Sequence, residues 1–137
     1  MALPDYIERV AVSSVLNRDS QQYGKIHLFD GRPDTCWNSD SGTPQWIMVD
    51  FKKPVKLTAV RIQFHGGFAA EEAVLQLWTK ETKDNKTAYP IFPANVSSLQ
   101  SFVFTDENAY TNACLLFRKA TDFFGRIIVY RLDLSFD

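Results

Sequence analysis

The sequence is poor in the residues on which most catalytic sites depend. It contains two histidines, His27 and His65, and two cysteines, Cys36 and Cys114. It has no Gly-x-Ser-x-Gly element for a serine nucleophile, no His-Glu-x-x-His helix for zinc and no glycine-rich phosphate loop. Because no motif supplies a nucleophile with its base or a catalytic metal, we expect no enzymatic activity.

The sequence also lacks an excess of positive or negative charge and a long apolar run. The 15 Lys and Arg residues stand against 16 Asp and Glu, which leaves no basic surface for nucleic acid or an anionic membrane. No apolar run approaches the roughly 18 residues that span a bilayer. Residues 1–6 lack the basic and apolar regions of a signal peptide. We expect a cytoplasmic or nuclear protein, not secreted, that binds neither nucleic acid nor membrane directly.

The two cysteines fit this location. Cys36 and Cys114 stand well inside the sequence, far from each other. In a reducing compartment, isolated cysteines are usually small buried hydrophobic residues rather than disulfide partners. We therefore expect both thiols to be unpaired.

What the sequence does contain is the pattern of a β-protein. Its 137 residues, 45% of them hydrophobic, suffice for one folded domain over 1–137 with a real core. Apolar and polar residues alternate with a period of two in most segments. This pattern predicts an antiparallel β-sandwich or jelly roll of some eight strands, with one short helix at 23–29 that ends before Gly31. The main strands are predicted at 9–16, 45–51, 60–64, 74–79, 99–104, 113–117 and 128–136.

Three details of these strands can be predicted. The apolar phase slips near Thr58, which indicates a β-bulge or a late strand start. Residues 80–86 form a polar connection, and the region around Pro90 and Pro93 is predicted to be irregular. In the last strand one set of alternate residues is predicted to share the apolar face: Ile128, Tyr130, Leu132, Leu134 and Phe136.

The segment 28–40 is the most informative part of the sequence. It combines an Asp-Gly and a Pro-Asp turn signal with several carboxylates and a large aromatic residue. A tight turn aims carbonyl oxygens at one point, and the Asp30 carboxylate and Thr35 hydroxyl would complete an oxygen cage for calcium. The alternative is a polar loop followed by a buried Trp37. The spacing is not that of an EF-hand.

The same segment carries a family resemblance. Residues 29–31 and 34–39 resemble the Asp-Gly-x-x-x-Thr-x-Trp-x-Ser element of discoidin domains, the coagulation-factor C-type domains of the galactose-binding-like superfamily. The resemblance continues through 45–51 and 59–63 and implies an all-β jelly-roll sandwich. Other segments resemble an intracellular single-domain branch associated with orphan nuclear receptors, and a ciliary intraflagellar-transport subunit is a more distant match. These segments are 13–18, 25–30, 63–68 and 120–126.

The resemblance also implies a structural calcium site. Its ligands would be the Asp30 carboxylate, the Thr35 hydroxyl and carbonyl, the main-chain oxygens of His27 and Arg32, and the last strand near Ser135. Relatives of this fold often have Glu at that last position, and fewer carboxylates weaken calcium binding. The ion would pin the loop to the final strand and would not activate water. Without calcium, Asp30 would cap nearby backbone N–H groups.

Loops at one end of the sandwich are the predicted binding site, because loops on a rigid scaffold carry function. Gly66 and Gly67 permit a sharp turn or a close approach by a partner. Exposed aromatic rings beside Arg side chains are typical of protein-binding hot spots. Of Phe123 and Phe124, one is expected to be buried. The predicted contact residues are Asn17, Arg18, Asn38, Asp40, Gln63, Gly66, Gly67, Phe68, Asp122, Phe123 and Arg126.

These observations predict a non-catalytic, intracellular protein-binding module. The resemblance implies a repressor-like regulator of a nuclear receptor, which would act by masking the receptor's DNA-binding surface. A carbohydrate-binding module with a glycan ligand and a subunit of a ciliary intraflagellar-transport complex are the two alternatives.

Overall fold

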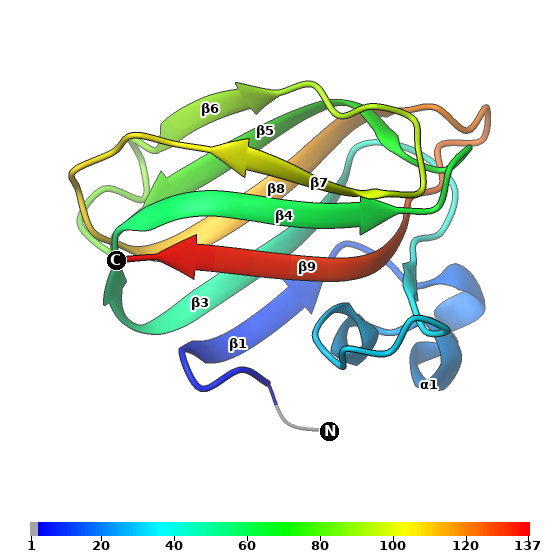
Figure 1. Ribbon diagram of the computed structural model, residues 1–137, viewed down its shortest axis with the longest axis horizontal. Coiled ribbons are helices and arrows are strands. Elements are labelled where there is room, and N and C mark those ends of the chain that lie inside the picture. The colour runs from blue at the N-terminus through cyan, green and yellow to red at the C-terminus, as the bar shows by residue number, and fades with distance from the viewer. Residues whose placement is uncertain (1–2) are drawn as a thin grey trace.

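Two antiparallel sheets face each other in the computed structural model, which describes residues 3–137 (Figure 1). The five-stranded sheet has the order β1 (Ile7–Val12), β3 (Gln45–Val55), β8 (Tyr110–Ala120), β5 (Ala70–Trp78) and β6 (Thr87–Ile91). The four-stranded sheet has the order β2 (Trp37–Asn38), β9 (Ile128–Phe136), β4 (Leu57–Phe64) and β7 (Leu99–Val103). The predicted antiparallel β-sandwich is confirmed.

Helical structure is limited to one end of the sandwich, beside β1 (Figure 1). It consists of a 3₁₀ turn η1 (Leu16–Arg18), the α-helix α1 (Ser20–Tyr23) and a second 3₁₀ turn η2 (Lys25–Leu28). The carboxylate of Asp19 accepts a hydrogen bond from the Gln22 N–H and so caps α1. The helix predicted at 23–29 is confirmed in part, because this range contains η2 and the last residue of α1, but the helical segment begins earlier, at Leu16. In residues 3–137 no helix combines the length and apolarity needed to cross a membrane.

Aromatic rings fill the space between the sheets. Trp37, Phe64 and Phe117 are all fully buried, with ring centroids 6.3 Å apart for Trp37 and Phe117 and 5.9 Å for Phe64 and Phe117. Removing such a ring from a packed core costs roughly 3–5 kcal/mol of stability. The predicted burial of Trp37 is confirmed, and its indole N–H donates to the carbonyl of Ser14.

The predicted slip near Thr58 is confirmed, because the register of β4 against β9 shifts between Leu57 and Ala59. Two other strand predictions were wrong in part. The region around Pro93 is irregular as predicted, but Pro90 lies in the edge strand β6, where a missing N–H is tolerated. The predicted bounds of β9 are confirmed, but its predicted apolar face fails at Tyr130.

The beginning of β9 contains a bulge. Gln63 pairs with Arg131, but its neighbour Phe64 pairs with Val129, so Tyr130 is left between the two pairs. The bulge buries Val129 and Leu132 on the inner side and moves Tyr130 off the core face. This shift places Tyr130 beside His65, at the end of β4.

Candidate functional site

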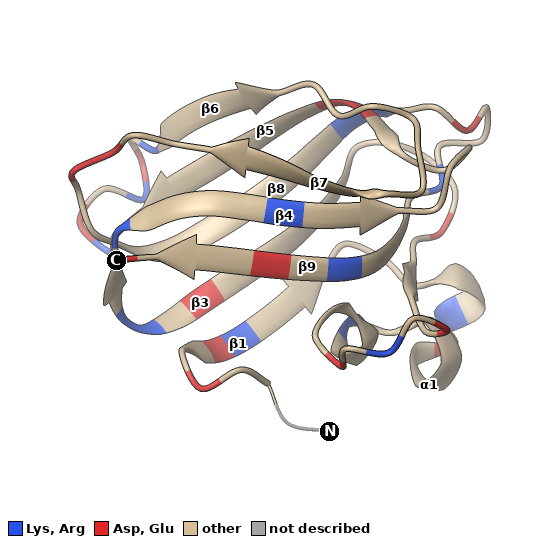
Figure 2. Cartoon of the chain, viewed as in Figure 1, with Lys and Arg blue, Asp and Glu red and all other residues tan. Residues whose placement is uncertain are grey.

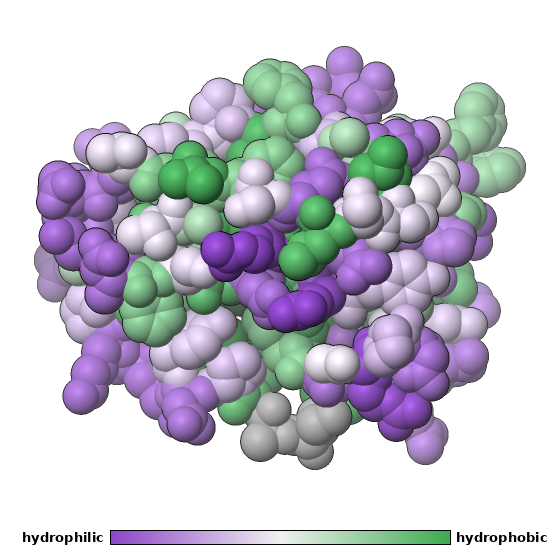
Figure 3. Space-filling model, viewed as in Figure 1, coloured by the Kyte–Doolittle hydropathy of each residue, from purple (hydrophilic) through white to green (hydrophobic). Residues whose placement is uncertain are grey.

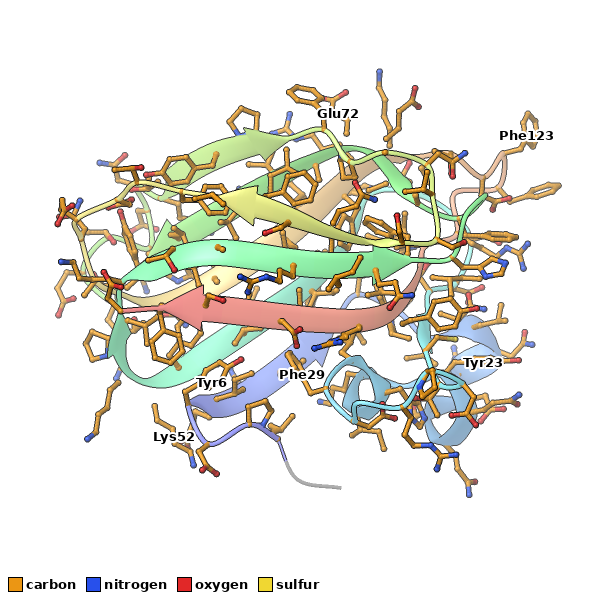
Figure 4. All side chains as sticks on the ribbon, in the orientation of Figure 1. Tyr6, Tyr23, Phe29, Lys52, Glu72 and Phe123 are labelled. Carbon is orange, nitrogen blue, oxygen red and sulfur yellow. The ribbon has the colours of Figure 1, made fainter. Side chains whose placement is uncertain are left out.

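The loop between β8 and β9 carries two exposed aromatic rings. The Asp122 carboxylate accepts hydrogen bonds from the backbone N–H of Arg126 (3.0 Å) and from its side-chain Nε (3.5 Å). Gly125, with a φ of +83°, closes the turn through its N–H to the Asp122 carbonyl. This turn lifts Phe123 and Phe124 to the tip, where they are 93% and 65% exposed. Figure 4 shows Phe123 projecting away from the sandwich.

A row of stacked side chains lies beside this tip. The Arg126 guanidinium carbon stands 4.9 Å from the centroid of the Phe68 ring, within the range of a cation–π contact. The His65 ring is 5.6 Å from Phe68 on one side and 5.7 Å from Tyr130 on the other. A hydrogen bond of 2.8 Å between His65 Nδ1 and the Tyr130 hydroxyl fixes the imidazole. The guanidinium is thus held between a ring and a carboxylate.

The turn that carries Phe68 is braced by the crossover between β6 and β7. The Gly66 N–H donates to the Ser97 hydroxyl (2.8 Å), and the Gly67 N–H donates to Asn95 Oδ1 (2.7 Å). Gly67 has a φ of +95°, which an L side chain rarely adopts. The Gln63 amide donates to the carbonyl of Ser97 (3.0 Å). Asn95 and Ser97 therefore position the turn from about thirty residues away in sequence.

Gln45 joins the remaining loops of this end into one unit. Its buried carboxamide oxygen accepts from the Ser13 and Ser14 hydroxyls, and its Nε2 donates to the carbonyls of Asp40 and Gly42. The Gly42 N–H in turn donates to the Phe124 carbonyl (2.7 Å). Because a buried, fully bonded amide resists rearrangement, the exposed rings sit on a rigid base.

Six of the predicted contact residues come together around this base: Gly66, Gly67, Phe68, Asp122, Phe123 and Arg126. Asp40 lies in the adjoining loop, exposed, with its carboxylate accepting from the Ser41 N–H. Asn17 and Arg18 are exposed at the same end but on the η1 side, with left-handed φ values of 55° and 57° (Figure 1).

Two of the predictions for this end need correction. Asn38 is 7% exposed and has no surface to offer a partner; its Oδ1 finds no hydrogen-bond partner within residues 3–137. The contact role of Gln63 stays a prediction: the residue is half-buried, and its Nε2 donates to the carbonyl of Ser97. The expectation that Phe123 or Phe124 is buried was wrong, because both rings are exposed and meet edge to face at 5.2 Å.

The acidic turn after η2 is held by hydrogen bonds. Asp30 Oδ1 accepts from the Arg32 N–H (2.9 Å), and Oδ2 accepts from the Thr35 hydroxyl (2.5 Å) and contacts His27 Nδ1 at 3.1 Å. The other imidazole nitrogen of His27 lies 2.9 Å from the carbonyl of Gln21. Burial alone would raise the pKa of Asp30, but the hydrogen bonds from Thr35, Arg32 and His27 hold that pKa below its usual value.

The predicted ligands Asp30, Thr35 and Arg32 converge at this turn, with the Thr35 hydroxyl 2.5 Å from Asp30 Oδ2 and 3.5 Å from the Arg32 carbonyl oxygen, but they are hydrogen-bonded to one another. Both oxygens of the single carboxylate, Asp30, are engaged with protein donors, and one contact comes from an imidazole rather than an oxygen. The turn borders Arg131 and Asp133 of β9. The Ser135 hydroxyl accepts a hydrogen bond from Arg61 instead. Residues 3–137 contain no group of three or more His, Cys, Asp or Glu suited to a metal ion.

Comparison with known families places this architecture. The profile of the family described as NedA-like, galactose-binding domain matches residues 27–111. The chain belongs to this family. It is 44% identical over 123 residues to Nuclear receptor 2C2-associated protein from Danio rerio, a match that covers 90% of this chain and 86% of the relative. It is 43% identical to the protein of the same name from Xenopus laevis, with 90% and 89% covered.

Solved structures share the fold at low sequence identity. A chitosan-binding module from a chitosanase/glucanase of Paenibacillus sp. IK-5 has a TM-score of 0.77 at 16% identity, covering 95% of this chain and 96% of that one. A Clostridium perfringens domain solved with GalNAc-β-1,3-galactose has a TM-score of 0.75 at 13% identity, covering 92% and 93%. At these identities the likeness concerns the fold alone, and it agrees with the β-sandwich that the sequence pattern predicts.

Sequence reasoning missed several residues of this galactose-binding-like domain that shape the site. Phe124, Asn95, Ser97 and Tyr130 were not among the predicted contact residues. Phe124 follows Phe123 directly, so the pair could have been predicted together from the turn signals around it. The other three act through a bulge or through hydrogen bonds to distant loops, for which the sequence carries no local signal.

Proposed function

We propose that this chain is a non-catalytic protein-binding module that regulates a nuclear receptor and binds it through the loops around Phe123. The relatives that cover most of the chain are named for association with nuclear receptor 2C2. The observation that carries the proposal is the exposed Phe123–Phe124 pair on a rigid turn beside Arg126. A receptor surface held by this pair would be masked from its other ligands, including DNA.

The energetics of the pair suit a binding hot spot. Burying an exposed Phe ring against a partner stabilises a complex by roughly 1.5–3 kcal/mol. Because hydrogen bonds from Gly42, Gly125 and Arg126 already fix the turn, little ordering entropy opposes binding. Arg126 supplies a guanidinium already oriented by Asp122, and Arg and aromatic residues dominate the energy of protein interfaces.

A binding measurement with matched variants tests this proposal. In isothermal titration with nuclear receptor 2C2, replacing Phe123 and Phe124 together by Ser should weaken binding at least tenfold, since two anchors are lost. The matched control is Phe92→Ser, because Phe92 is also an exposed ring, 71% accessible, but lies on the β6–β7 crossover. Phe92→Ser should leave the dissociation constant unchanged.

A second double variant probes the row of stacked side chains. Phe68→Ala with Arg126→Ala should weaken receptor binding while the unfolding transition stays cooperative. If a pulldown with this variant recovers every partner of the wild type, the binding surface does not lie at this end of the sandwich.

The non-catalytic part of the proposal is supported by how the nucleophilic and basic side chains are used. Both histidines are tied to fixed partners, His27 to Asp30 and His65 to Tyr130. Burial raises the pKa of Cys114 to about 11 and also raises the pKa of Cys36, so neither thiol is activated as a nucleophile.

We propose that the protein is located in the cytoplasm, the nucleus or both. Imaging of the tagged full chain would check this location.

A glycan is the second candidate ligand. Solved structures of the same fold include a chitosan-binding module and a domain in complex with GalNAc-β-1,3-galactose. The open face of Phe123 could stack on a sugar ring, with Arg126 donating to its hydroxyl groups. A glycan array on which the wild type binds no sugar would dismiss this candidate and leave the protein ligand.

A further inference from the structure

The sandwich formed by residues 3–137 has four edge strands, and three of them are protected against pairing with another chain. In β1 the exposed Glu8 and Arg9 and a register shift between Ile7 and Arg9 protect the edge. In β6 the edge is protected by Pro90, which lacks an N–H. The edge strand β2 is protected by its short length of two residues. Charges, prolines, bulges and short length are the devices that prevent edge-to-edge association.

Among the strands of residues 3–137, β7 is the edge strand that lacks all of these devices. Its sequence, Leu99 to Val103, has no charge and no proline, and its pairing with β4 is regular from end to end. The uncharged stretch is longer than the strand, because no ionisable Lys, Arg, His, Asp or Glu occurs from Thr87 to Thr105. Figure 2 shows β6 and β7 free of blue and red, and in Figure 3 separate apolar groups stand among paler and polar ones over this part of the face.

The free backbone groups of β7 can be assigned from its pairing. The Phe104 N–H donates to the Thr58 carbonyl, so the pair 58–104 is hydrogen-bonded. Antiparallel pairs alternate between bonded and non-bonded, and the register of β4 and β7 is regular. Leu99, Ser101 and Val103 therefore direct their N–H and C=O groups away from β4, toward the open edge.

The side chains of these three residues also face outward. Leu99, Ser101 and Val103 are exposed, Val103 by 78%, whereas Gln100 and Phe102 between them are partly buried. A large aliphatic side chain that is this exposed on an uncharged strand marks an interaction surface. Phe92 and Val96 on the crossover add further exposed apolar area to the same uncharged stretch.

We propose that β7 is the interface through which two copies of this chain pair, edge to edge, about a two-fold axis at Ser101. Leu99 and Val103 are each two residues from Ser101, so an antiparallel copy places Leu99 opposite Val103 of its partner on both sides of the axis. All three pairs exchange their free backbone hydrogen bonds, and the side-chain pairs are apolar. The strand is complementary to itself in hydrogen bonding, shape and charge, as an isologous interface requires.

The first test is the mass in solution. A five-residue strand pair is a small interface, so sedimentation should show a monomer–dimer equilibrium at concentrations of roughly 1 to 300 µM. Ser101→Glu should shift the protein to monomer, with a dissociation constant more than tenfold higher, because the two carboxylates meet at the axis. In the monomer this Glu faces Arg61 across the β4–β7 ladder, an attractive pair that preserves the fold.

The matched control is Ala88→Glu, which adds the same charge at an exposed position of the edge strand β6. It should leave the dimer intact. A wild type that stays monomeric throughout this range overturns the proposal, and so does a dimer that survives Ser101→Glu. If a monomeric wild type instead loses a different protein partner upon Ser101→Glu, the edge accepts another chain and not a second copy.

A disulfide tests the position of the axis. Residues opposite each other in a bonded antiparallel pair have Cα atoms about 5.5 Å apart, within disulfide range. Ser101→Cys should therefore cross-link to its copy under mild oxidation. Ser98→Cys is the control, because two copies of residue 98 would be roughly 20 Å apart and should not cross-link. Equal cross-linking of the two variants would contradict the register.

Discussion

At the scale of single residues, one carboxylate in the connection between β7 and β8 links several strands. Asp106 Oδ2 accepts hydrogen bonds from the hydroxyls of Tyr89 on β6 (2.6 Å) and Tyr110 on β8 (2.8 Å). Burial alone would raise the pKa of Asp106, but the hydrogen bonds from Tyr89, Asn108 and Tyr110 hold it below its usual value. The contact with Asp106 raises the pKa of Tyr89 to about 12.

This cluster predicts two pH windows. The raised pKa of Tyr89 means that its contribution to stability is complete below about pH 10, its unfolded pKa, and is lost as the pH rises to about 12. The lowered pKa of Asp106 means that its contribution is present above about pH 4 and is lost as the pH falls further. Tyr89→Phe should lower the unfolding free energy at neutral pH by about 1.5 kcal/mol. It should also reduce the decrease of the unfolding free energy between about pH 10 and pH 12.

Urea denaturation at a series of pH values measures both effects, and ultraviolet absorbance follows the tyrosines directly. Tyr23→Phe is the control, because the Tyr23 hydroxyl has no side-chain hydrogen bond within the described part of the chain. It should change the stability little and leave the alkaline slope as in the wild type. An unchanged alkaline slope in Tyr89→Phe would contradict the assignment of the raised pKa to Tyr89.

At the scale of elements, two glycine turns allow backbone strain to be separated from close packing. Gly125 and Gly31 both have positive φ, +83° and +71°. A Cβ at Gly125 would lie 2.8 Å from the backbone carbon of Gly42, whereas a Cβ at Gly31 would meet nothing within 4 Å. Both Ala variants carry conformational strain of roughly 1 kcal/mol, and Gly125→Ala should lose a further 1–2 kcal/mol through the clash.

Thermal unfolding of the two variants measures this difference. Gly125→Ala should also weaken receptor binding, because the clash separates the loop of Phe123 and Phe124 from the Gly42 N–H. Gly31→Ala should bind the receptor as the wild type does. Equal destabilisation by the two substitutions would mean that the two loops are not packed as closely as the geometry implies.

The turn at Asp30 predicts the response to calcium. Because both carboxylate oxygens already accept protein hydrogen bonds, a chelator or excess calcium should change the melting temperature by less than about 1 °C. A true site filled at a hundred times its dissociation constant would stabilise the fold by about 2.7 kcal/mol. A heat of calcium binding that disappears in Asp30→Asn would contradict this prediction.

The sequence predicts the position of most strands, but not their register or their place in the sheet. Alternation of apolar and polar residues predicts the strands β3, β4 and β7 themselves. The shift at Tyr130 depends on the register that β9 adopts against β4, and Pro90 is tolerated because β6 has a neighbour on one side only. A short segment does not encode its partners' register or its position at an edge, so the orientation of Tyr130 and the strand at Pro90 were not predicted.

In the candidate site, too, some features are predicted by the sequence and others are not. The turn signals around Gly66 and Asp122 predict loops that carry aromatic rings, and the Phe68 ring lies beside Arg126 while Phe123 is exposed at the tip of its loop. Whether a polar residue faces solvent depends on what covers it. Asn38 looks like a surface amide in the sequence, but it is buried.

At the scale of the whole molecule, the loop end and the β7 edge make a joint prediction. Pairing of antiparallel β7 strands about Ser101 turns the two loop ends in opposite directions, so a dimer presents two separate binding ends. Sedimentation of the saturated complex with the receptor should give two chains of each protein for the wild type and one of each for Ser101→Glu.

The affinity of each loop end should not depend on the dimer. Because Ser101 and Phe123 lie on different parts of the sandwich, the dissociation constant per site should agree within about twofold between wild type and Ser101→Glu. Replacing Phe123 and Phe124 together by Ser should have the opposite effect on the two properties: receptor binding is abolished while the dimer persists. If Ser101→Glu also abolishes receptor binding, the receptor occupies the β7 edge and the two surfaces are not independent.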